Sequence, residues 1–243
     1  MAIIKGTNKN NVLNGTAFND FIFGLKGNDT LFGFGGRDLL FGNDGNDKLF
    51  GGSGSDILYG GKDKNILTGG TGQDTYVLTK GKSNADTINI AEGESFTSAA
   101  DVIFTGKVTG FDTIIGFDKY DKLNLDVNSS RVMANTNVNT VNDTVHFKNF
   151  SVNNGILNLK NGANNVALTS EALLQEAFIY VISNLDVIPN DVAVAVNVDI
   201  GVNETNSPIR GKHALVFVDH TDPGFTIVDV VGSLNSLSLS QVI

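Results

Sequence analysis

The sequence predicts a mainly all-β protein in which a parallel β-roll of eight nine-residue repeats is followed by a β-rich C-terminal region with one helix. The first observation is a nine-residue period that runs from Gly6 to Val77 without an insertion. Its units are GTNKNNVLN, GTAFNDFIF, GLKGNDTLF, GFGGRDLLF, GNDGNDKLF, GGSGSDILY, GGKDKNILT and GGTGQDTYV. The second observation is that apolar and polar residues alternate in several later segments, which is typical of strands.

Each unit is long enough for only one turn and one strand, which excludes a helical repeat or a propeller blade. The first five positions are rich in glycine, as a tight turn with left-handed backbone angles requires. The eighth position is apolar in every unit, so we predict a three-residue strand with one inward side chain. Two units then close a coil of 18 residues, and eight units form four coils. The inward residues are Leu13, Ile22, Leu31, Leu40, Leu49, Leu58, Leu67 and Tyr76.

The sixth position carries aspartate in six units and asparagine in the other two. If successive units alternate between two edges of the coil, residues 18 apart stack, giving one file of Asp20, Asp38, Asp56 and Asp74 and another of Asn11, Asp29, Asp47 and Asn65. Stacked coils lie about 4.8 Å apart, and two carboxylates at that distance repel by roughly 3.5 kcal/mol at an effective dielectric constant of about 20. A cation must offset this repulsion. Ca²⁺ takes several oxygen ligands, so it suits carboxylates combined with the carbonyls of glycine turns.

Two units, 51–59 and 69–77, begin GGSGSD and GGTGQD, and three more lack only the second glycine. On these motifs the tract resembles the RTX calcium-binding nonapeptide G-G-x-G-x-D-x-U-x, which implies a parallel β-roll with Ca²⁺ between stacked turns. The resemblance implies sites between Asp20 and Asp38, Asp38 and Asp56, Asp56 and Asp74, and Asp29 and Asp47, with a weaker site between Asp47 and Asn65. The residues that it assigns to the metal are Asp20, Asp29, Asp38, Asp47, Asp56, Asp74, Asn65, Gly27, Gly36, Gly45, Gly54 and Gly72.

Departures from the repeat predict where the roll ends. Unit 6–14 has Lys9 and Asn11 in place of the family's glycine and aspartate, so we expect it to cap the roll. Residues 78–126 read as flanking strands, and FDTIIGFDKYDKLNLD resembles a segment that follows RTX rolls. The resemblance implies capping strands, in some members with an extra calcium, that contain Asp112, Asp118 and Asp121.

Residues 127–243 are predicted to form a β-rich C-terminal region. Strand-like segments there are TVHFKNF, GILNLK, VAVAVNV, HALVFVD and FTIVDVVGS. The stretch TSEALLQEAFIYVISNL, residues 169–185, is the one predicted helix, with Thr169 or Ser170 as its N-cap and apolar residues at helical spacing. The C-terminal SLNSLSLSQVI is compatible with the uncleaved type I secretion signal that RTX proteins carry.

Composition excludes several classes of function. The chain of 243 residues has a net charge of −9, which argues against nucleic acid or an anionic membrane as its partner. It has no cysteine, which excludes thiol redox chemistry and Cys-ligated zinc. No stretch is long and apolar enough to span a bilayer, and the N-terminal MAIIKGTN does not read as a cleavable signal peptide.

The predicted function is that of an extracellular calcium-binding RTX module, not an enzyme, which folds on calcium after it leaves the cell. The resemblance implies a type I secretion channel as the partner in transit and a secreted or cell-surface location. An enzyme is not favoured because HExxH is absent and His146, His213 and His220 are far apart in the sequence.

The alternative is a carbohydrate-binding or adhesion module of a secreted surface protein or of an epimerase-like enzyme, with a cell-surface glycan or a surface protein as its partner. It depends on the aromatic ninth positions, Phe23, Phe32, Phe41, Phe50 and Tyr59. These rings are expected to point outward, where they form either a glycan-binding stripe or a cross-strand stacking ladder.

Overall fold

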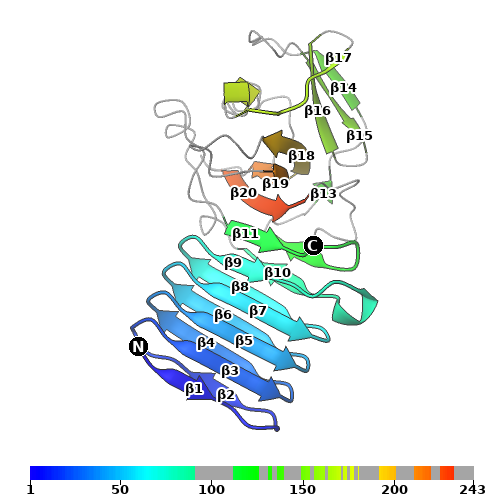
Figure 1. Cartoon of the computed structure of the whole chain (residues 1–243). Coiled ribbons are helices and arrows are strands. Elements are labelled where there is room, and N and C mark those ends of the chain that lie inside the picture. The colour runs from blue at the N-terminus through cyan, green and yellow to red at the C-terminus, as the bar shows by residue number, and fades with distance from the viewer. Residues whose placement is uncertain are drawn as a thin grey trace. The chain divides into compact units, whose positions relative to one another are not determined.

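The described residues of the computed structural model form two units, and the repeat tract lies in the first of them (Figure 1). The first unit is built from residues 1–90 and 112–125. The second contains the described ranges 131–132, 136–139, 149–153, 156–161, 164–170, 172–173, 176–177, 180, 192–200, 211–219 and 225–232. The prediction of a mainly β protein with a parallel β-roll is confirmed.

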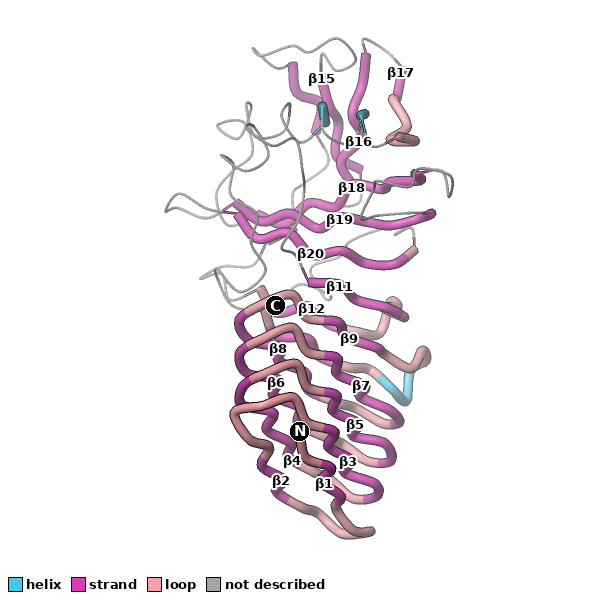
Figure 2. The backbone as a smooth tube through the Cα atoms, turned by 60° about the vertical axis from the view of Figure 1, so that its left-hand side comes forward, coloured by secondary structure: helices cyan, strands magenta, loops and turns pink. Residues whose placement is uncertain are grey.

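In the first unit the chain winds from one parallel sheet to the other and back, as Figure 2 shows. The first sheet of the roll contains, in spatial order, β1 (Ile3–Lys5), β3 (Phe21–Lys26), β5 (Leu39–Asp44), β7 (Ile57–Lys62), β9 (Thr75–Val77) and β11 (Asp112–Ile115). The second sheet contains β2 (Val12–Asn14), β4 (Thr30–Gly35), β6 (Lys48–Ser53), β8 (Ile66–Thr71), β10 (Thr87–Asn89) and β12 (Lys122–Asn124).

Neighbouring strands of the repeats pair in an 18-residue register, as the sequence predicts. Ile22 pairs with Leu40, and Leu40 with Leu58. Strands β3 to β8 are six residues long, not three. They are longer because pairing continues into the next turn, where Leu25 still lies opposite Asn43.

The core of the roll is a single file of apolar side chains on each sheet. Seven of the eight predicted inward residues have no exposed surface: Ile22, Leu31, Leu40, Leu49, Leu58, Leu67 and Tyr76. Leu13, on the outermost strand of the second sheet, is half-buried. One large apolar side chain per nine residues is a thin core, so burial of apolar surface alone stabilises this fold weakly.

The roll continues beyond the eight repeats. In the second sheet Ile88 of β10 lies between Leu67 and Leu123. In the first sheet Ile114 of β11 lies opposite Tyr76. The flanking strands predicted for residues 78–126 thus extend the two sheets of the roll. The short 3₁₀ helix η1 (Lys82–Asn84) precedes β10.

The second unit has a mixed sheet in the order β20 (Phe225–Val231), β19 (Gly211–Asp219), β18 (Val192–Ile200), β16 (Ile156–Asn161), β15 (Asn149–Asn153) and β14 (Thr136–Asn139). Two short strands, β13 (Arg131–Val132) and β17 (Asn164–Asn165), pair with β18 and β16. The three long C-terminal strands match the segments VAVAVNV, HALVFVD and FTIVDVVGS.

The predicted helix is present at its described residues. Residues 172–173, 176–177 and 180 are helical, and the backbone N–H of Leu173 donates to Oγ of Ser170 at 3.3 Å. This bond identifies Ser170 as the N-cap. Among the described residues, no helix has both the length and the apolar character needed to cross a membrane.

The single-file core predicts a large effect of one truncation. Leu49 has no exposed surface, so Leu49→Ala should lower the free energy of unfolding by about 2–5 kcal/mol. The exposed neighbour Lys48 provides the matched control, because Lys48→Ala removes a side chain that lies outside the core. Denaturant unfolding of both variants in saturating calcium measures the difference, and equal stability of the two would contradict a core placed at the eighth position.

Candidate metal centre

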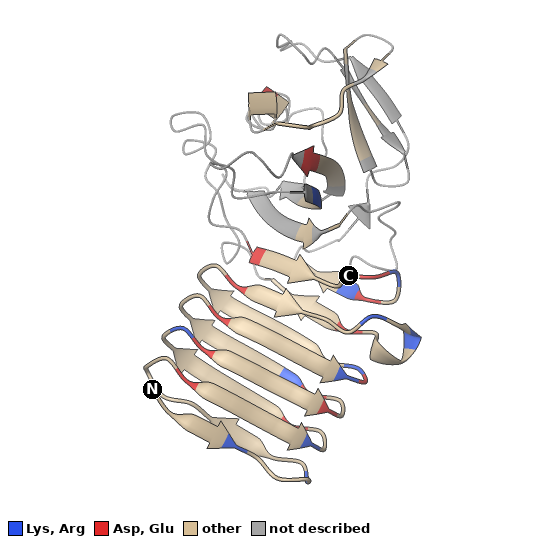
Figure 3. Ribbon diagram, viewed as in Figure 1, with Lys and Arg blue, Asp and Glu red and all other residues tan. Residues whose placement is uncertain are grey.

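The sixth residue of each complete repeat lies at the end of a turn, immediately before a strand. Figure 3 shows acidic segments that recur at the same place on successive coils. We call the turns that contain Asp20, Asp38, Asp56 and Asp74 the Asp38 edge, and those that contain Asn11, Asp29, Asp47 and Asn65 the Asp47 edge. At most 1% of the surface is exposed for Asp20, Asp29, Asp38, Asp47, Asp56, Asn65 and Asp74.

One oxygen of each of these side chains binds the preceding coil. Oδ1 of Asp38 accepts a hydrogen bond from the backbone N–H of Asp20 at 2.7 Å. Oδ1 of Asp47 accepts the same bond from Asp29 at 2.7 Å. Oδ1 makes this bond across 18 residues in Asp29, Asp56, Asn65 and Asp74 as well. The files therefore satisfy buried amides that would otherwise have no partner.

Both files continue past the repeats. Oδ1 of Asp112 accepts a hydrogen bond from the N–H of Asp74 at 2.8 Å. On the other edge, Oδ1 of Asp86 accepts one from Asn65 at 2.8 Å, and Oδ1 of Asp121 accepts one from Asp86 at 3.0 Å. Asp86 is missing from the sequence-based prediction because residues 78–80 shift it out of the nine-residue frame. The signal is nevertheless present, since GKSNADTIN has glycine first, aspartate sixth and isoleucine eighth.

The second carboxylate oxygen, Oδ2, lies beside the glycine at the first position of its own unit. A Cβ atom at Gly24 would lie 2.6 Å from Oδ2 of Asp29 and 2.8 Å from the carbonyl oxygen of Gly42, the first glycine of the next coil. We call the space bounded by these two oxygens and the first-position glycine a cradle. Among the described residues that have this oxygen buried without a hydrogen-bond partner are Asp29, Asp38, Asp47, Asp56 and Asp86. Asp86 has no cradle, because a Cβ at Gly81, the first residue of its unit, would meet only Nδ2 of Asn84 at 3.8 Å.

The first-position glycines are the part of this geometry that the sequence-based assignment lacks. Four cradles repeat the same arrangement, at Gly24, Gly33, Gly42 and Gly51. Each glycine leaves room because it has no Cβ, and each cradle takes its carbonyl from the first glycine one coil later. The available signal is that all eight units begin with glycine.

The cradles fit a hard divalent cation. Each brings a carboxylate oxygen and a backbone carbonyl oxygen to one point, and Ca²⁺ prefers such oxygen ligands with flexible geometry. Within the part of the chain that the structure describes, no three His, Cys, Asp or Glu side chains gather into a metal cluster. The oxygens that the structure brings together at a cradle come from one carboxylate and one backbone carbonyl, a set that suits calcium better than zinc.

The pKa values of the buried carboxyl groups show how strongly this environment disfavours a bare charge. Burial, followed by repulsion from neighbouring aspartates, raises the pKa of Asp47 and of Asp56 to about 6 against hydrogen bonds that lower it. Burial raises the pKa of Asp29 and of Asp38 as well. For Asp86, burial raises the pKa to about 7. An adjacent cation would reverse these shifts.

Asp20 differs from the other aspartates of its edge. Its Oδ2 accepts hydrogen bonds from the backbone N–H and the hydroxyl of Thr16, at 2.7 and 2.8 Å. Burial opposes ionisation of Asp20, but the bonds from Thr16 and Ala2 outweigh it, and the pKa lies below its ordinary value. The site expected between Asp20 and Asp38 thus lacks the unpartnered oxygen that the four cradles provide.

Asn65 also lies in its file as predicted, but it offers a cation less. Its Oδ1 is bonded to the N–H of Asp47, and its Nδ2 donates to the carbonyl of Lys62 at 3.3 Å. A Cβ at Gly60 would meet Nδ2 at 2.9 Å where other units present Oδ2. The amide carries donor hydrogens and no charge, so this position contributes little to cation binding.

The fourth-position glycines shape the turns. The φ angle is 113° at Gly27 and 131° at Gly45, a left-handed region that favours glycine. A Cβ at Gly45 would collide with the carbonyl of Gly27 in the preceding coil. The same conformation and close approach recur at Gly36, Gly54 and Gly72. Their observed role is to let coils stack closely, which brings the cradle oxygens together.

A second ladder, which the sequence analysis lacks, runs beside the Asp47 edge. The fifth-position side chain of Asn10 accepts a hydrogen bond from the N–H of Asn28 at 2.9 Å. Asn28 in turn accepts one from Asn46, and Asn46 one from Lys64. This ladder holds the turn backbone in register one residue before the aspartates, so it supports the geometry of the cradles.

The aromatic ninth positions form a stacking ladder on each sheet, so of the two arrangements expected from the sequence the cross-strand stacking ladder is confirmed. The ring centroids of Phe23 and Phe41 lie 4.9 Å apart with an interplanar angle of 5°, and Phe41 and Tyr59 lie 4.6 Å apart at 7°. Phe32 and Phe50 stack at 5.0 Å on the other sheet. Phe41 therefore has another ring stacked on each of its faces.

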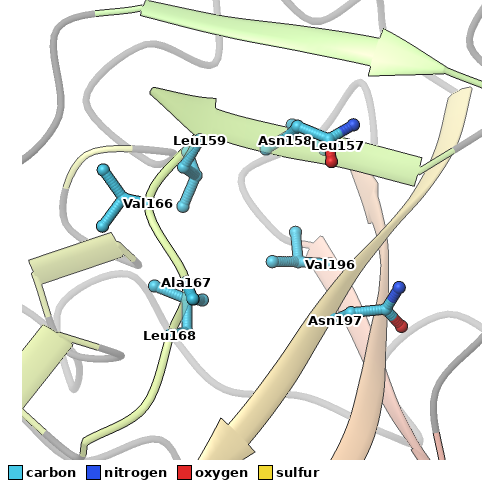
Figure 4. A pocket seen from close by; sticks show the side chains of 8 residues that line it. All are labelled: Leu157, Asn158, Leu159, Val166, Ala167, Leu168, Val196 and Asn197. Carbon is cyan, nitrogen blue, oxygen red and sulfur yellow. The ribbon is translucent and has the colours of Figure 1, made fainter. Parts of the chain in front are cut away.

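The second unit contains a pocket of about 260 Å³ beside β16 and β18 (Figure 4). It is lined by Leu157, Asn158, Leu159, Val166, Ala167, Leu168, Val196 and Asn197. None of these side chains is ionisable, so the pocket lining offers no acid, base or nucleophile. His213 is buried elsewhere in this unit, in β19, and His146 and His220 lie outside the described residues.

Comparison with known families agrees with the geometry of the first unit. A family model described as the RTX calcium-binding nonapeptide repeat, in four copies, matches residues 5–40 and again residues 41–76. No curated protein is similar enough in sequence to this chain to count as a match.

The cradle predicts that substituting one glycine removes a calcium site, whereas substituting a nearby glycine does not. Gly33→Ala places a methyl group against Oδ2 of Asp38 and the carbonyl of Gly51, so the protein should bind one calcium ion fewer. Gly35→Ala is the matched control, because its methyl group would meet Ser53 Oγ at 3.3 Å and no cradle oxygen. Isothermal titration calorimetry with calcium measures both stoichiometries. An unchanged stoichiometry for a folded Gly33→Ala variant would place the ion elsewhere.

The raised carboxyl pKa values predict how the calcium-free roll responds to pH. The pKa values of Asp47, Asp56 and Asp86 rise from an ordinary 3.8 to about 6, 6 and 7, respectively. The folded roll therefore keeps protons on these three groups that the unfolded chain releases. Their contribution to stability is fully present below about pH 4 and is lost as the pH rises through 6 to 7. Calcium-free protein should show more β structure by circular dichroism at pH 5 than at pH 7.5.

Calcium affinity should follow the opposite course, because the cation requires the carboxylate form. Asp56→Asn supplies the control, since it removes one titrating group from the file and should weaken the pH dependence of the calcium-free protein. A calcium-free β signal that is equal at pH 5 and pH 7.5, or weaker at pH 5, is incompatible with these shifts.

Proposed function

Residues 5–76 belong to the RTX calcium-binding nonapeptide repeats, and we propose that this chain is an extracellular, non-enzymatic module whose roll folds when calcium binds. The observation that carries the proposal is the cradle. Its carboxylate oxygen is fully buried and has no partner among the described residues, and it faces a backbone carbonyl of the next coil. A buried carboxylate with an unpartnered oxygen is costly unless a cation is present.

The two carboxylate oxygens of Asp38 have different roles in the site. Oδ1 of Asp38 is bonded to the coil before it, while Oδ2 and the Gly51 carbonyl are directed into the cradle. A calcium ion bound there supplies positive charge and links two coils through oxygen ligands. Each aspartate is thus bonded to the coil before it and, through a bound ion, is linked to the first-position glycine of the coil after it.

This coupling supports a folding switch. Extracellular calcium modules bind with dissociation constants of about 10⁻⁴–10⁻³ M, so such sites remain unfilled at the low free calcium inside a cell. Without calcium, like charges are stacked along both edges of the roll around a thin core. The free energy of binding then becomes free energy of folding.

Family membership supports the proposed location and route. We propose that the chain leaves the cell through a type I secretion channel while the roll is unfolded, and that it acts outside the cell or at its surface. The proposed secretion signal in the C-terminal SLNSLSLSQVI lies outside the described residues. The proposed partners are calcium ions and, in transit, the secretion channel.

The geometry of the aromatic residues does not favour the carbohydrate-binding alternative. Sugars stack on the faces of exposed rings, whereas Phe41 is covered on both faces by Phe23 and Tyr59. The ladder on each sheet is better explained as cross-strand packing. An adhesion role through a surface protein is compatible with the calcium switch, and binding of the calcium-loaded protein to cell-surface glycans and proteins would reveal either partner.

A calcium titration followed by circular dichroism tests the switch. Calcium-depleted protein at pH 7.5 should lose β structure and regain it at millimolar calcium, whereas Mg²⁺ should substitute poorly because it requires a smaller octahedral site. Asp38→Asn should raise the midpoint by roughly tenfold, about 1.4 kcal/mol. Asp44→Asn should not, since Asp44 lies on the surface in a salt bridge with Lys62 at 2.8 Å.

Two outcomes contradict the proposal. One is a spectrum that excess chelator leaves unchanged at pH 7.5. The other is an equal shift of the calcium midpoint in the Asp38 and Asp44 variants, since one carboxylate is buried in a cradle and the other is exposed.

A further inference from the structure

The turns of the roll have two different backbone conformations. In the six turns from residue 24 onward, the second and fourth positions both have positive φ, as at Gly52 and Gly54. The first two turns differ, because Thr7, Lys9, Thr16 and Phe18 at the corresponding positions stay outside the left-handed region. The four cradles all belong to the left-handed kind.

In the first two turns a threonine hydroxyl lies against the sixth side chain. Thr16 donates its N–H and its hydroxyl to Oδ2 of Asp20, at 2.7 and 2.8 Å. Thr7 makes the same pair of bonds to Oδ1 of Asn11, at 2.6 and 3.2 Å. The hydroxyl of Thr16 also accepts the N–H of Phe18 at 3.1 Å. Donors of one residue thus satisfy the oxygen that remains unpartnered in the cradles.

At the other end of the Asp38 edge, the hydroxyl of Tyr76 stands beside a first-position glycine. It accepts the N–H of Gly69 at 3.0 Å and donates to Oδ2 of Asp112 at 3.2 Å. A Cβ at Gly69 would lie against Oδ2 of Asp74 and 2.6 Å from this hydroxyl. At Gly51, one coil earlier, the corresponding neighbour is the carbonyl of the next first-position glycine. Tyr76 is also the one tyrosine among the leucines and isoleucines at the eighth position.

We propose that the hydroxyl groups of Thr16 and Tyr76 take the place of cations at the two ends of the Asp38 edge, so that ions are confined to the cradles of Asp38 and Asp56 between them. This inference rests on the proposed calcium function and specifies where its sites stop. A hydroxyl can donate to a buried carboxylate without adding charge, so it closes a file of stacked carboxylates where no further ion is shared. On the Asp47 edge Thr7 and Asn65 bracket the cradles of Asp29 and Asp47.

The distribution has a countable consequence. Within the described part of the chain, the cradles at Gly24, Gly33, Gly42 and Gly51 provide four calcium sites, two on each edge. Removing a closing hydroxyl should open one further site on the Asp38 edge. The Thr16 end needs two changes, because its turn must also be able to adopt the left-handed conformation at the second and fourth positions.

The test is the number of calcium ions bound per chain, measured by equilibrium dialysis and native mass spectrometry. Thr16→Gly combined with Phe18→Gly converts GTAFND into GGAGND, and this variant should bind one ion more than the wild type. Tyr76→Phe keeps the buried ring, removes only the hydroxyl, and should likewise gain one ion. Thr16→Ser, which retains the hydroxyl, is the matched control and should bind the wild-type number.

The outcomes separate the two claims. A wild type that binds no calcium overturns both the proposed function and this inference. A calcium-binding wild type whose two variants are folded by circular dichroism and gain no ion overturns this inference alone. A gain in Thr16→Ser equal to that in the double-glycine variant also overturns it, because the hydroxyl would then not be the closing group.

Discussion

The stacking of carboxylates at the spacing of successive coils is the constraint on which the roll depends. An 18-residue register places each aspartate directly above another, and the turns bury them almost completely. One oxygen of each is satisfied by the backbone of the coil before it. The other has no partner in the four cradles, so the structure divides each carboxylate into a half that organises the backbone and a half that requires a cation.

The thin core makes this arrangement decisive for stability. A roll that buries one large side chain per nine residues gains little from apolar burial in each unit, whereas every unit must order its backbone. The first-position glycine affects both the ordering of the turn and the binding of the cation. It allows the turn to approach the aspartate closely, and its carbonyl completes the cradle of the unit one coil earlier. A Cβ at this position would collide with the aspartate Oδ2 and with the carbonyl of the next coil, so a larger residue would disrupt both the turn and the cradle.

The sequence alone predicts those features that follow from the repeat period. The nine-residue frame identifies the inward residues, the two edges and the aspartate files, because each depends on position within the unit. It misses Asp86, which three extra residues move out of frame, although the backbone restores the register by pairing Ile88 with Leu67. It also misses the closing roles of Thr16 and Tyr76, since these arise from contacts with a neighbouring turn and not from the pattern of one unit.

The conformations of Leu25 and Phe34 show that the register, not local preference, sets the shape of the turns. Both have positive φ, 80° and 74°, although a side chain there costs roughly 1–2 kcal/mol relative to glycine. Each lies opposite a left-handed residue of the next coil, Asn43 and Gly52 respectively. From residue 24 onward, each turn therefore shares the left-handed conformation of its neighbours even where its own residues disfavour it. Thr16 does not adopt this conformation. Its N–H and hydroxyl bond to Oδ2 of Asp20 instead, and these bonds satisfy the oxygen that a cation would otherwise require.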